Sequence, residues 1–171
     1  MRVVVAAAGQ GRPDFVGSVH PATAAALAEY APEAEVRYVG GDELAYWGLL
    51  GELWADAEPF VLIEHDVEID GATLAQLESC PELRCAFPYL LRSDELTTAP
   101  WCEAWAEALL GCVRFSGELI RAHPDAVTAI PAAGRQWKVL DVRLAAQLRR
   151  RGVTTHRHSP AVRHHHRGAW A

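Results

Sequence analysis

The run Phe-Val-Leu-Ile-Glu-His-Asp at residues 60–66 restricts the fold more than any other part of the chain. Its first four residues are apolar without alternation, which is typical of a strand that is covered on both faces of a parallel sheet. Three polar residues follow directly, at the carboxyl end of that strand. In open α/β sheets, ligands bind at this edge. The run therefore predicts an α/β domain with a ligand site just after Ile63.

Apolar runs and helical patterns alternate along the chain, with short connections between them. Strands are expected at residues 2–8, 36–39, 60–66, 85–91, 112–116, 127–130 and 153–158. Helices are expected from Pro21 to about Tyr30, after Asp42 as N-cap, at 72–79, and through the apolar stripes 101/105/109 and 140/144/148, the last ending at Gly152. This order predicts one α/β domain over residues 1–171, with a mostly parallel open sheet flanked by helices.

Length and composition narrow the class of protein. The chain has 171 residues, half of them apolar, which suits one domain with a full core. No stretch approaches the roughly 20 apolar residues of a membrane span, so a cytosolic protein without membrane contact is expected. The net charge of −6 excludes a uniformly basic nucleic-acid-binding surface. The cysteines match no common zinc spacing and are expected to be reduced thiols in or near the core: Cys80, Cys85, Cys102 and Cys112.

Glu64-His65-Asp66 is the first candidate for chemistry. On an extended backbone the two carboxylates point to the same side, whereas His65 faces the other side of the sheet. Such a pair suits a hard divalent cation that also binds phosphate oxygens. A solvated acidic strand end, with Asp66 capping a turn, explains the triplet equally well on composition alone.

The C-terminal histidines are the second candidate. His156 and His158 share one face of an extended chain, and so do His164 and His166. Imidazole binds Mn²⁺, Zn²⁺ or Fe²⁺. The alternative is an exposed basic tail.

Trp137 and Asp141 form the third candidate, where an amphipathic helix is expected to begin. A carboxylate there can act as a general base toward an acceptor hydroxyl. The alternative is a plain charge near a helix N-terminus, which the helix dipole favours.

The fourth candidate is the Gly-rich loop Ala7–Arg12, whose backbone N–H groups can approach phosphate. It resembles the Ala-Ala-Gly-x-Gly-x-Arg loop of sugar and isoprenoid nucleotidyltransferases. It departs from that loop because Arg12 comes one residue early and no Pro-Lys pair follows.

Taken together, these segments resemble the GT-A fold glycosyltransferases. In that family a strand ends in an acidic motif, often Asp-x-Asp, which holds a metal ion on the nucleotide diphosphate. The resemblance implies that Asp66 is a metal ligand, that His164 or His166 completes the site, and that Asp141 is the catalytic base of an inverting enzyme. It also implies that the donor nucleotide contacts Ala8, Gly9, Asp42, Glu64, His65, Asp66 and Trp137.

A closer resemblance is to small family-2-like proteins of actinobacteria and their phages, and it covers most of the chain from residue 60 onward. The matching segments are 61–69, Cys80-Pro81 with 85–89, 110–116, Trp137 with Leu140-Asp141, and the alternating segment from His156 to His166. Glu64 departs from the family's first Asp.

The resemblance implies a Mn²⁺- or Mg²⁺-dependent glycosyltransferase that uses a UDP- or GDP-sugar. Residues 1–91 are expected to bind the nucleotide, and residues 92–171 to provide the acceptor and metal half. The acceptor is expected to be soluble, and hydroxymethylated pyrimidines in DNA are one candidate, with Arg149–Arg151, Arg163 and Arg167 available for phosphates. The alternatives are a nucleotidyltransferase, which consumes a nucleoside triphosphate and a sugar phosphate, and a sugar- or nucleotide-binding module without catalysis.

Overall fold

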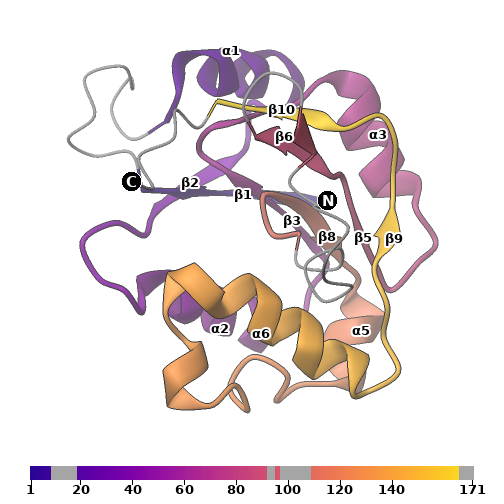
Figure 1. Cartoon of the computed structure of the whole chain (residues 1–171). Coiled ribbons are helices and arrows are strands. Elements are labelled where there is room, and N and C mark those ends of the chain that lie inside the picture. The colour runs from indigo at the N-terminus through magenta and orange to yellow at the C-terminus, as the bar shows by residue number, and fades with distance from the viewer. Residues whose placement is uncertain (9–18, 92–94, 97–108, 166–171) are drawn as a thin grey trace.

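A computed structural model describes residues 1–8, 19–91, 95–96 and 109–165 (Figure 1). In this part of the chain a six-stranded central sheet has the order β2-β1-β3-β8-β5-β9. Its strands are β1 (Arg2–Ala7), β2 (Glu35–Tyr38), β3 (Phe60–Glu64), β5 (Arg84–Ala86), β8 (Cys112–Phe115) and β9 (His156–Arg157). All described pairings are parallel except those of β8 with β3 and β5. The predicted α/β fold with a mostly parallel sheet is therefore confirmed.

Helices cover both faces of this sheet (Figure 1). One face packs against α2 (Ala45–Ala55), α5 (Gly117–Ala122) and α6 (Trp137–Arg149), and the other against α1 (Pro21–Tyr30) and α3 (Gly71–Ser79). Strand β3 serves both cores, since Leu62 joins the first and Val61 and Ile63 join the second. This double burial explains the unbroken apolar run in its sequence. None of the described helices combines the length and apolar character that crossing a membrane requires.

A second, four-stranded sheet has the order β4-β10-β6-β7. Its strands are β4 (Val67–Glu68), β6 (Tyr89–Leu91), β7 (Glu95–Leu96) and β10 (Val162–His164). The single strand expected at 85–91 is therefore wrong. The chain leaves the central sheet after Ala86, and residues 89–91 pair with β10 instead. This change of sheet brings the C-terminal segment back beside the end of β3.

The helix boundaries follow local capping. Helix α1 begins with Pro21, as expected, and the side chain of Asp70 caps α3 by accepting from the Thr73 backbone N–H at 2.7 Å. Asp42 does not cap α2, which begins at Ala45. Its carboxylate accepts from the Leu44 N–H at 2.8 Å, so it stabilises the turn before the helix.

Two further expectations on the second half of the chain are wrong. Asp141 is the fifth residue of α6 and not at its start, because the helix already begins at Trp137. Residues 127–130 form turns and no strand. Val127 is buried there, and its carbonyl accepts from the Trp47 indole N–H at 3.0 Å. The end of α6 before Gly152, at φ +80°, is as expected, whereas the stripe positions 101 and 105 lie outside the described residues.

Candidate active site

The carboxyl end of β3 is held by backbone hydrogen bonds on both sides. The N–H of Glu64 donates to the carbonyl of Gly111 at 2.9 Å, and the N–H of His65 donates to the carbonyl of Ala6 at 3.1 Å. In the register of the parallel pair, Glu64 lies opposite Ala6 of β1. The first polar residues after the buried strand therefore have a fixed backbone.

The C-terminal segment is fastened beside this strand end. The N–H of His165 donates to the carbonyl of Asp66 at 2.7 Å, and the ring nitrogen Nε2 of His165 lies 2.8 Å from Oε2 of Glu68. The same ring stacks on His20 with their centroids 4.1 Å apart. These contacts place the preceding residue, His164, next to the acidic strand end.

Glu64, Asp66 and His164 form a carboxylate–histidine cluster, whose candidate ligand atoms all lie within 4.8 Å of one another. Nε2 of His164 is 3.4 Å from Oδ1 of Asp66 and 3.8 Å from Oε2 of Glu64. The side chains of Asp66 and His164 are only 4% and 8% exposed. Tyr46 donates its hydroxyl to Oε1 of Glu64 at 3.3 Å, which orients the other oxygen of that carboxylate.

A positive charge must compensate two carboxylates in so enclosed a place. Burial lowers the pKa of His164, but the hydrogen bond with Glu64 and the charges of Asp66 and Glu64 outweigh it, so the net shift is upward. Without a metal ion the imidazole can supply the charge as a proton. Two carboxylates and one imidazole also make a suitable donor set for Mn²⁺ or Mg²⁺, so these residues fit the expected cation.

Asp141 lies close enough to this cluster to feel its charge. The pKa of Asp141 is raised to about 7, mainly because burial removes the carboxyl group from solvent. The N–H of Val142, which donates to Oδ1 at 2.7 Å, opposes the shift, the charge of Glu64 adds to it, and Arg84 lowers it. A carboxyl group that titrates near neutral pH is suited to general acid–base chemistry.

The other residues expected at the site have varied positions. Ala8 is exposed directly after β1, and Asp42 is exposed after β2. Trp137 is 39% exposed. Its backbone N–H donates to the carbonyl of Glu43 at 3.1 Å, so α6 begins beside the turn that contains Asp42. His65 is half-buried and is not part of the carboxylate–histidine cluster.

Some expected residues lie outside the described part of the chain, namely Gly9 to Arg12 and His166. The histidines also divide between two places. His164 lies with the carboxylates, whereas His156 and His158 lie with Cys80. The sequence analysis treated all the C-terminal histidines as one candidate metal-binding set. In the structure, the described members of that set belong to two separate clusters.

Sequence reasoning missed three residues around the site. The hydroxyl group of Tyr46 donates a hydrogen bond to Glu64, and the ring of His20 stacks on His165. The charge of Arg84 lowers the pKa of Asp141. Arg84 gave the one usable signal, since it is a charged residue within an apolar strand pattern and is 1% exposed. Buried arginines are rare unless they are paired, so such a residue indicates a nearby polar partner.

No family model matches the chain, and no curated protein matches it in sequence. Solved structures match nearly its whole length. A protein described as a glucose-1-phosphate thymidylyltransferase from Bacillus anthracis, in complex with a sucrose, has a TM-score of 0.53 at 14% identity, covering 93% of this chain and 87% of that chain. A CMP:2-keto-3-deoxy-manno-octonic acid synthetase complexed with CTP has a TM-score of 0.50 at 11% identity, covering 94% and 89%.

A glycosyltransferase involved in glycosylation of the major capsid of PBCV-1 is a further match, with a TM-score of 0.49 at 9% identity, covering 94% of this chain and 83% of that chain. At these identities similarity extends to the fold alone. The matches with the thymidylyltransferase and the synthetase bear out the expected fold type over almost the entire chain.

Proposed function

We propose that the chain is a cation-dependent glycosyltransferase, which moves a sugar from a nucleoside diphosphate to a hydroxyl group. One observation carries the proposal. The carboxyl group of Asp141, whose pKa is raised to about 7, lies within the electrostatic reach of the carboxylate–histidine cluster. A titratable carboxyl group within reach of a candidate cation site, which itself follows β3 at the edge where open α/β sheets bind ligands, supports the proposal.

The raised pKa favours a hydroxyl acceptor. A hydroxyl group must lose its proton as it attacks, and a base with a pKa near the working pH serves this step well. In nucleotidyl transfer the attacking group is a sugar phosphate, which is already ionised at neutral pH. A base that titrates near pH 7 thus has a clear use in glycosyl transfer and little use in the alternative.

In the proposed reaction, a bond forms between the acceptor oxygen and the anomeric carbon as the bond from that carbon to the diphosphate breaks. Asp141 accepts the hydroxyl proton. Asp66 and His164 hold the cation with Glu64 as a further ligand, and the cation, when bound, offsets the charge of the leaving diphosphate. Tyr46 keeps the Glu64 carboxylate in position through its hydroxyl group.

The donor is proposed to lie along the carboxyl ends of β1, β2 and β3. Ala8 directly follows β1, Asp42 follows β2, and His65 follows β3. Gly9, which lies outside the described residues, is proposed to contact the donor together with Ala8. Trp137, exposed at the start of α6, offers an aromatic surface near Asp42. These positions suit a UDP- or GDP-sugar, with residues 1–91 contributing most nucleotide contacts and residues 92–171 contributing His164 and the base.

The acceptor is a soluble hydroxyl compound in this proposal, and hydroxymethylated pyrimidines in DNA remain one candidate. The arginines considered for phosphate contacts give this candidate limited support. Arg151 is held by Asp125 through two hydrogen bonds of 2.6 and 2.9 Å, and Arg150 bonds to Gln147. Modified DNA therefore belongs in an acceptor screen beside glycans and small alcohols.

The test is a panel of UDP- and GDP-sugars, with and without Mn²⁺, in which release of the nucleoside diphosphate is measured with each class of acceptor. We expect Mn²⁺-dependent release from at least one donor. Donors that bind without release would indicate a binding module, and donors that neither bind nor react would contradict the proposal.

Nucleotidyl transfer is the second candidate, because the matched structures include a protein described as a thymidylyltransferase and a CMP-sugar synthetase complexed with CTP. It predicts pyrophosphate release from a nucleoside triphosphate and a sugar phosphate. Measuring pyrophosphate and nucleoside diphosphate release on the same preparation distinguishes the two reactions.

A further inference from the structure

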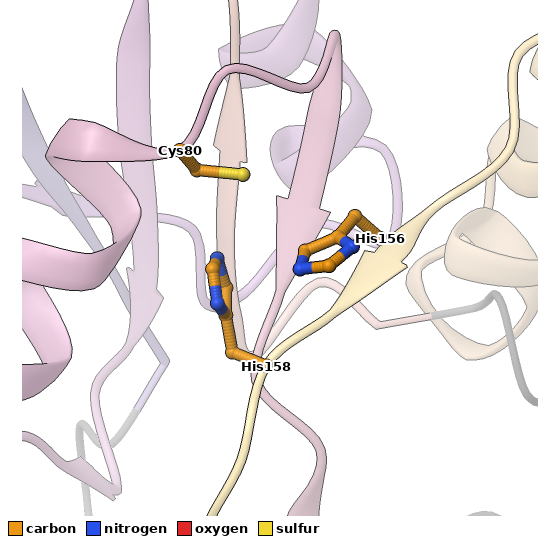
Figure 2. A group of neighbouring side chains, drawn as sticks. All are labelled: Cys80, His156 and His158. Atoms are coloured by element: carbon orange, nitrogen blue, oxygen red, sulfur yellow. The ribbon is translucent and has the colours of Figure 1, made fainter.

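A second group of metal-binding side chains lies away from the proposed active site. Cys80, His156 and His158 form a thiol–histidine cluster, in which one candidate ligand atom of each residue lies within 4.8 Å of the others. Figure 2 shows the thiol and both imidazole rings turned toward a common point between α3 and β9. The sequence had suggested no zinc pattern for the cysteines, because the histidines come from a distant part of the chain.

The backbone holds all three residues in place. Cys80 is the C-cap of α3 and is 6% exposed. His156 lies opposite Cys85 in the parallel pair of β9 and β5, and the N–H of His158 donates to the carbonyl of Ala86 at 2.9 Å. Since residues two apart on an extended strand point to the same side, both imidazoles face the helix that ends at Cys80.

His158 supplies an independent sign that a ligand belongs here. Its ring stacks on Phe87 with centroids 4.9 Å apart and lies edge-on to His156, also at 4.9 Å. Its Nε2 atom is closed off from solvent and has no hydrogen-bond partner among the described residues. A buried polar atom without a partner costs about 1–3 kcal/mol, and a metal ion can remove that cost.

The donor set favours zinc over the cations of the other cluster. A thiolate and two imidazoles suit a borderline-soft ion, whereas carboxylates suit Mg²⁺ or Mn²⁺. Ligand atoms around a tetrahedral zinc ion lie roughly 3.3–3.8 Å apart, given bond lengths of about 2.0–2.3 Å. The candidate ligand atoms lie within 4.8 Å of one another, so they need to approach by about 1.5 Å at most to reach that spacing. The exposed His156 leaves the site open to an ion from solvent.

We propose that Cys80, His156 and His158 bind a zinc ion, with the fourth position left to solvent. On binding, the thiol proton of Cys80 passes to solvent and the thiolate, Nε2 of His158 and one ring nitrogen of His156 coordinate the ion. The ion joins the end of α3 to the edge strand β9. It thereby fixes the start of the segment that continues to His164, and this role does not depend on the proposed glycosyl transfer.

Cobalt titration of the metal-free full-length protein tests the proposal. One equivalent of Co²⁺ is expected to produce thiolate-to-metal charge-transfer absorption in the near ultraviolet, and Zn²⁺ is expected to abolish it. The absorption should be absent in Cys80→Ser and retained in Cys112→Ala, which alters a buried cysteine outside the cluster. It should also be retained in His164→Ala, which alters only the carboxylate–histidine cluster.

Since Cys80 is buried, a second variant guards against a loss that reflects misfolding. His156→Ala changes an exposed residue and should weaken zinc binding about tenfold or more with an unchanged circular dichroism spectrum. His123→Ala, a half-buried histidine elsewhere, should bind zinc as the unaltered chain does. Absence of the absorption in the unaltered protein, its persistence in Cys80→Ser, or its loss in His164→Ala would overturn the proposal.

Discussion

The carboxylate–histidine and thiol–histidine clusters take their histidines from one short segment, residues 156–164, but they differ in their other ligands. The first combines an imidazole with two carboxylates from the end of β3. The second combines two imidazoles with a thiol from the end of α3. Histidine binds many metals, so the partner residue decides which ion each cluster prefers. Asp66 and Cys80, rather than the histidines, therefore determine which metal ion each cluster prefers.

The two clusters also differ in where the fold places them. The carboxylate–histidine cluster lies at the carboxyl ends of β1 and β3, beside a carboxyl group whose pKa is about 7. The thiol–histidine cluster lies on the outermost strand of the central sheet, against the end of α3. In open α/β sheets ligands bind at the first position, whereas the second lies where an edge strand meets the end of a helix. This difference in position agrees with the proposed catalytic role of the first cluster and the proposed stabilising role of the second.

Replacing the proposed base should have the largest effect on activity and none on zinc binding. Asp141→Asn is expected to lower kcat roughly 10²- to 10⁴-fold, because the acceptor proton loses its acceptor. The measurement is nucleoside diphosphate release at saturating donor. Arg143→Gln, an exposed change on the same helix, is the matched control and should keep kcat within about twofold. Equal losses in both variants would mean that the helix, and not the carboxyl group, matters.

The pH profile provides a second reading of Asp141. The carboxylate form is the active one, so kcat should fall about tenfold per pH unit below about 7, and this fall should be absent in Asp141→Asn.

The raised pKa of Asp141 also makes folding stability depend on pH. The folded state binds the Asp141 proton more tightly than the unfolded chain does, so the free energy of unfolding decreases as the pH rises from 3.8 to about 7. Asp141→Asn should therefore melt at a higher temperature than the unaltered protein at pH 8.

Replacing Asp66 should separate the two clusters. Asp66→Asn keeps the shape of the side chain but removes a charge from the cation site, and kcat/KM should fall roughly 10²- to 10³-fold. Cobalt–thiolate absorption should be unchanged, because Cys80 is not affected. Asp125→Asn, an exposed aspartate paired with Arg151, serves as the control. If Asp66→Asn abolished that absorption, the distinction between the clusters would be wrong.

Local patterns in the sequence predicted the parts of the fold that depend on neighbouring residues. The unbroken apolar run of β3 reflects burial on both faces, and strand alternation put Glu64 and Asp66 on one side. The predicted start of α2 was wrong because Asp42 forms an Asx turn before the helix and is not its N-cap. The same residue type suits both positions, so the sequence does not distinguish them. The expected strand at residues 127–130 was wrong because Val127 and Ile130 fill the core from turns.

The meeting of distant segments could not be predicted in the same way. His164 reaches Asp66 because the chain forms a second sheet, in which β10 pairs with β4. Cys80 meets His158 because β9 adds to the edge of the central sheet beside β5. Neither pairing leaves a periodic signal in sequence, since strand partners are chosen by the whole fold. The sequence therefore indicated which residues could bind a metal ion, but not which of them would come together in one site.

Zinc should stabilise the protein through the thiol–histidine cluster. At 100 times its Kd, a ligand that binds only the folded state adds about 2.7 kcal/mol. For a chain of this size, that corresponds to about 5–10 °C in Tm. Differential scanning fluorimetry with Zn²⁺ and with a chelator measures the difference. His156→Ala should lose most of the zinc-dependent increase, whereas His123→Ala should retain it.

The smallest expected effect is that of Tyr46→Phe, which removes one hydrogen bond to Glu64 and no charge. The O···O distance of 3.3 Å indicates a weak bond, worth about 1 kcal/mol at most. We expect kcat to fall roughly two- to fivefold. The Mn²⁺ concentration needed for half-maximal activity should rise, because the Glu64 carboxylate, without this hydrogen bond, rotates away from the cation position. Tyr30→Phe, an exposed tyrosine at the end of α1, is the matched control. Zinc binding should be the same in both variants. A loss in Tyr46→Phe as large as that in Asp66→Asn would mean that Glu64, and not Asp66, is the principal ligand of the cation.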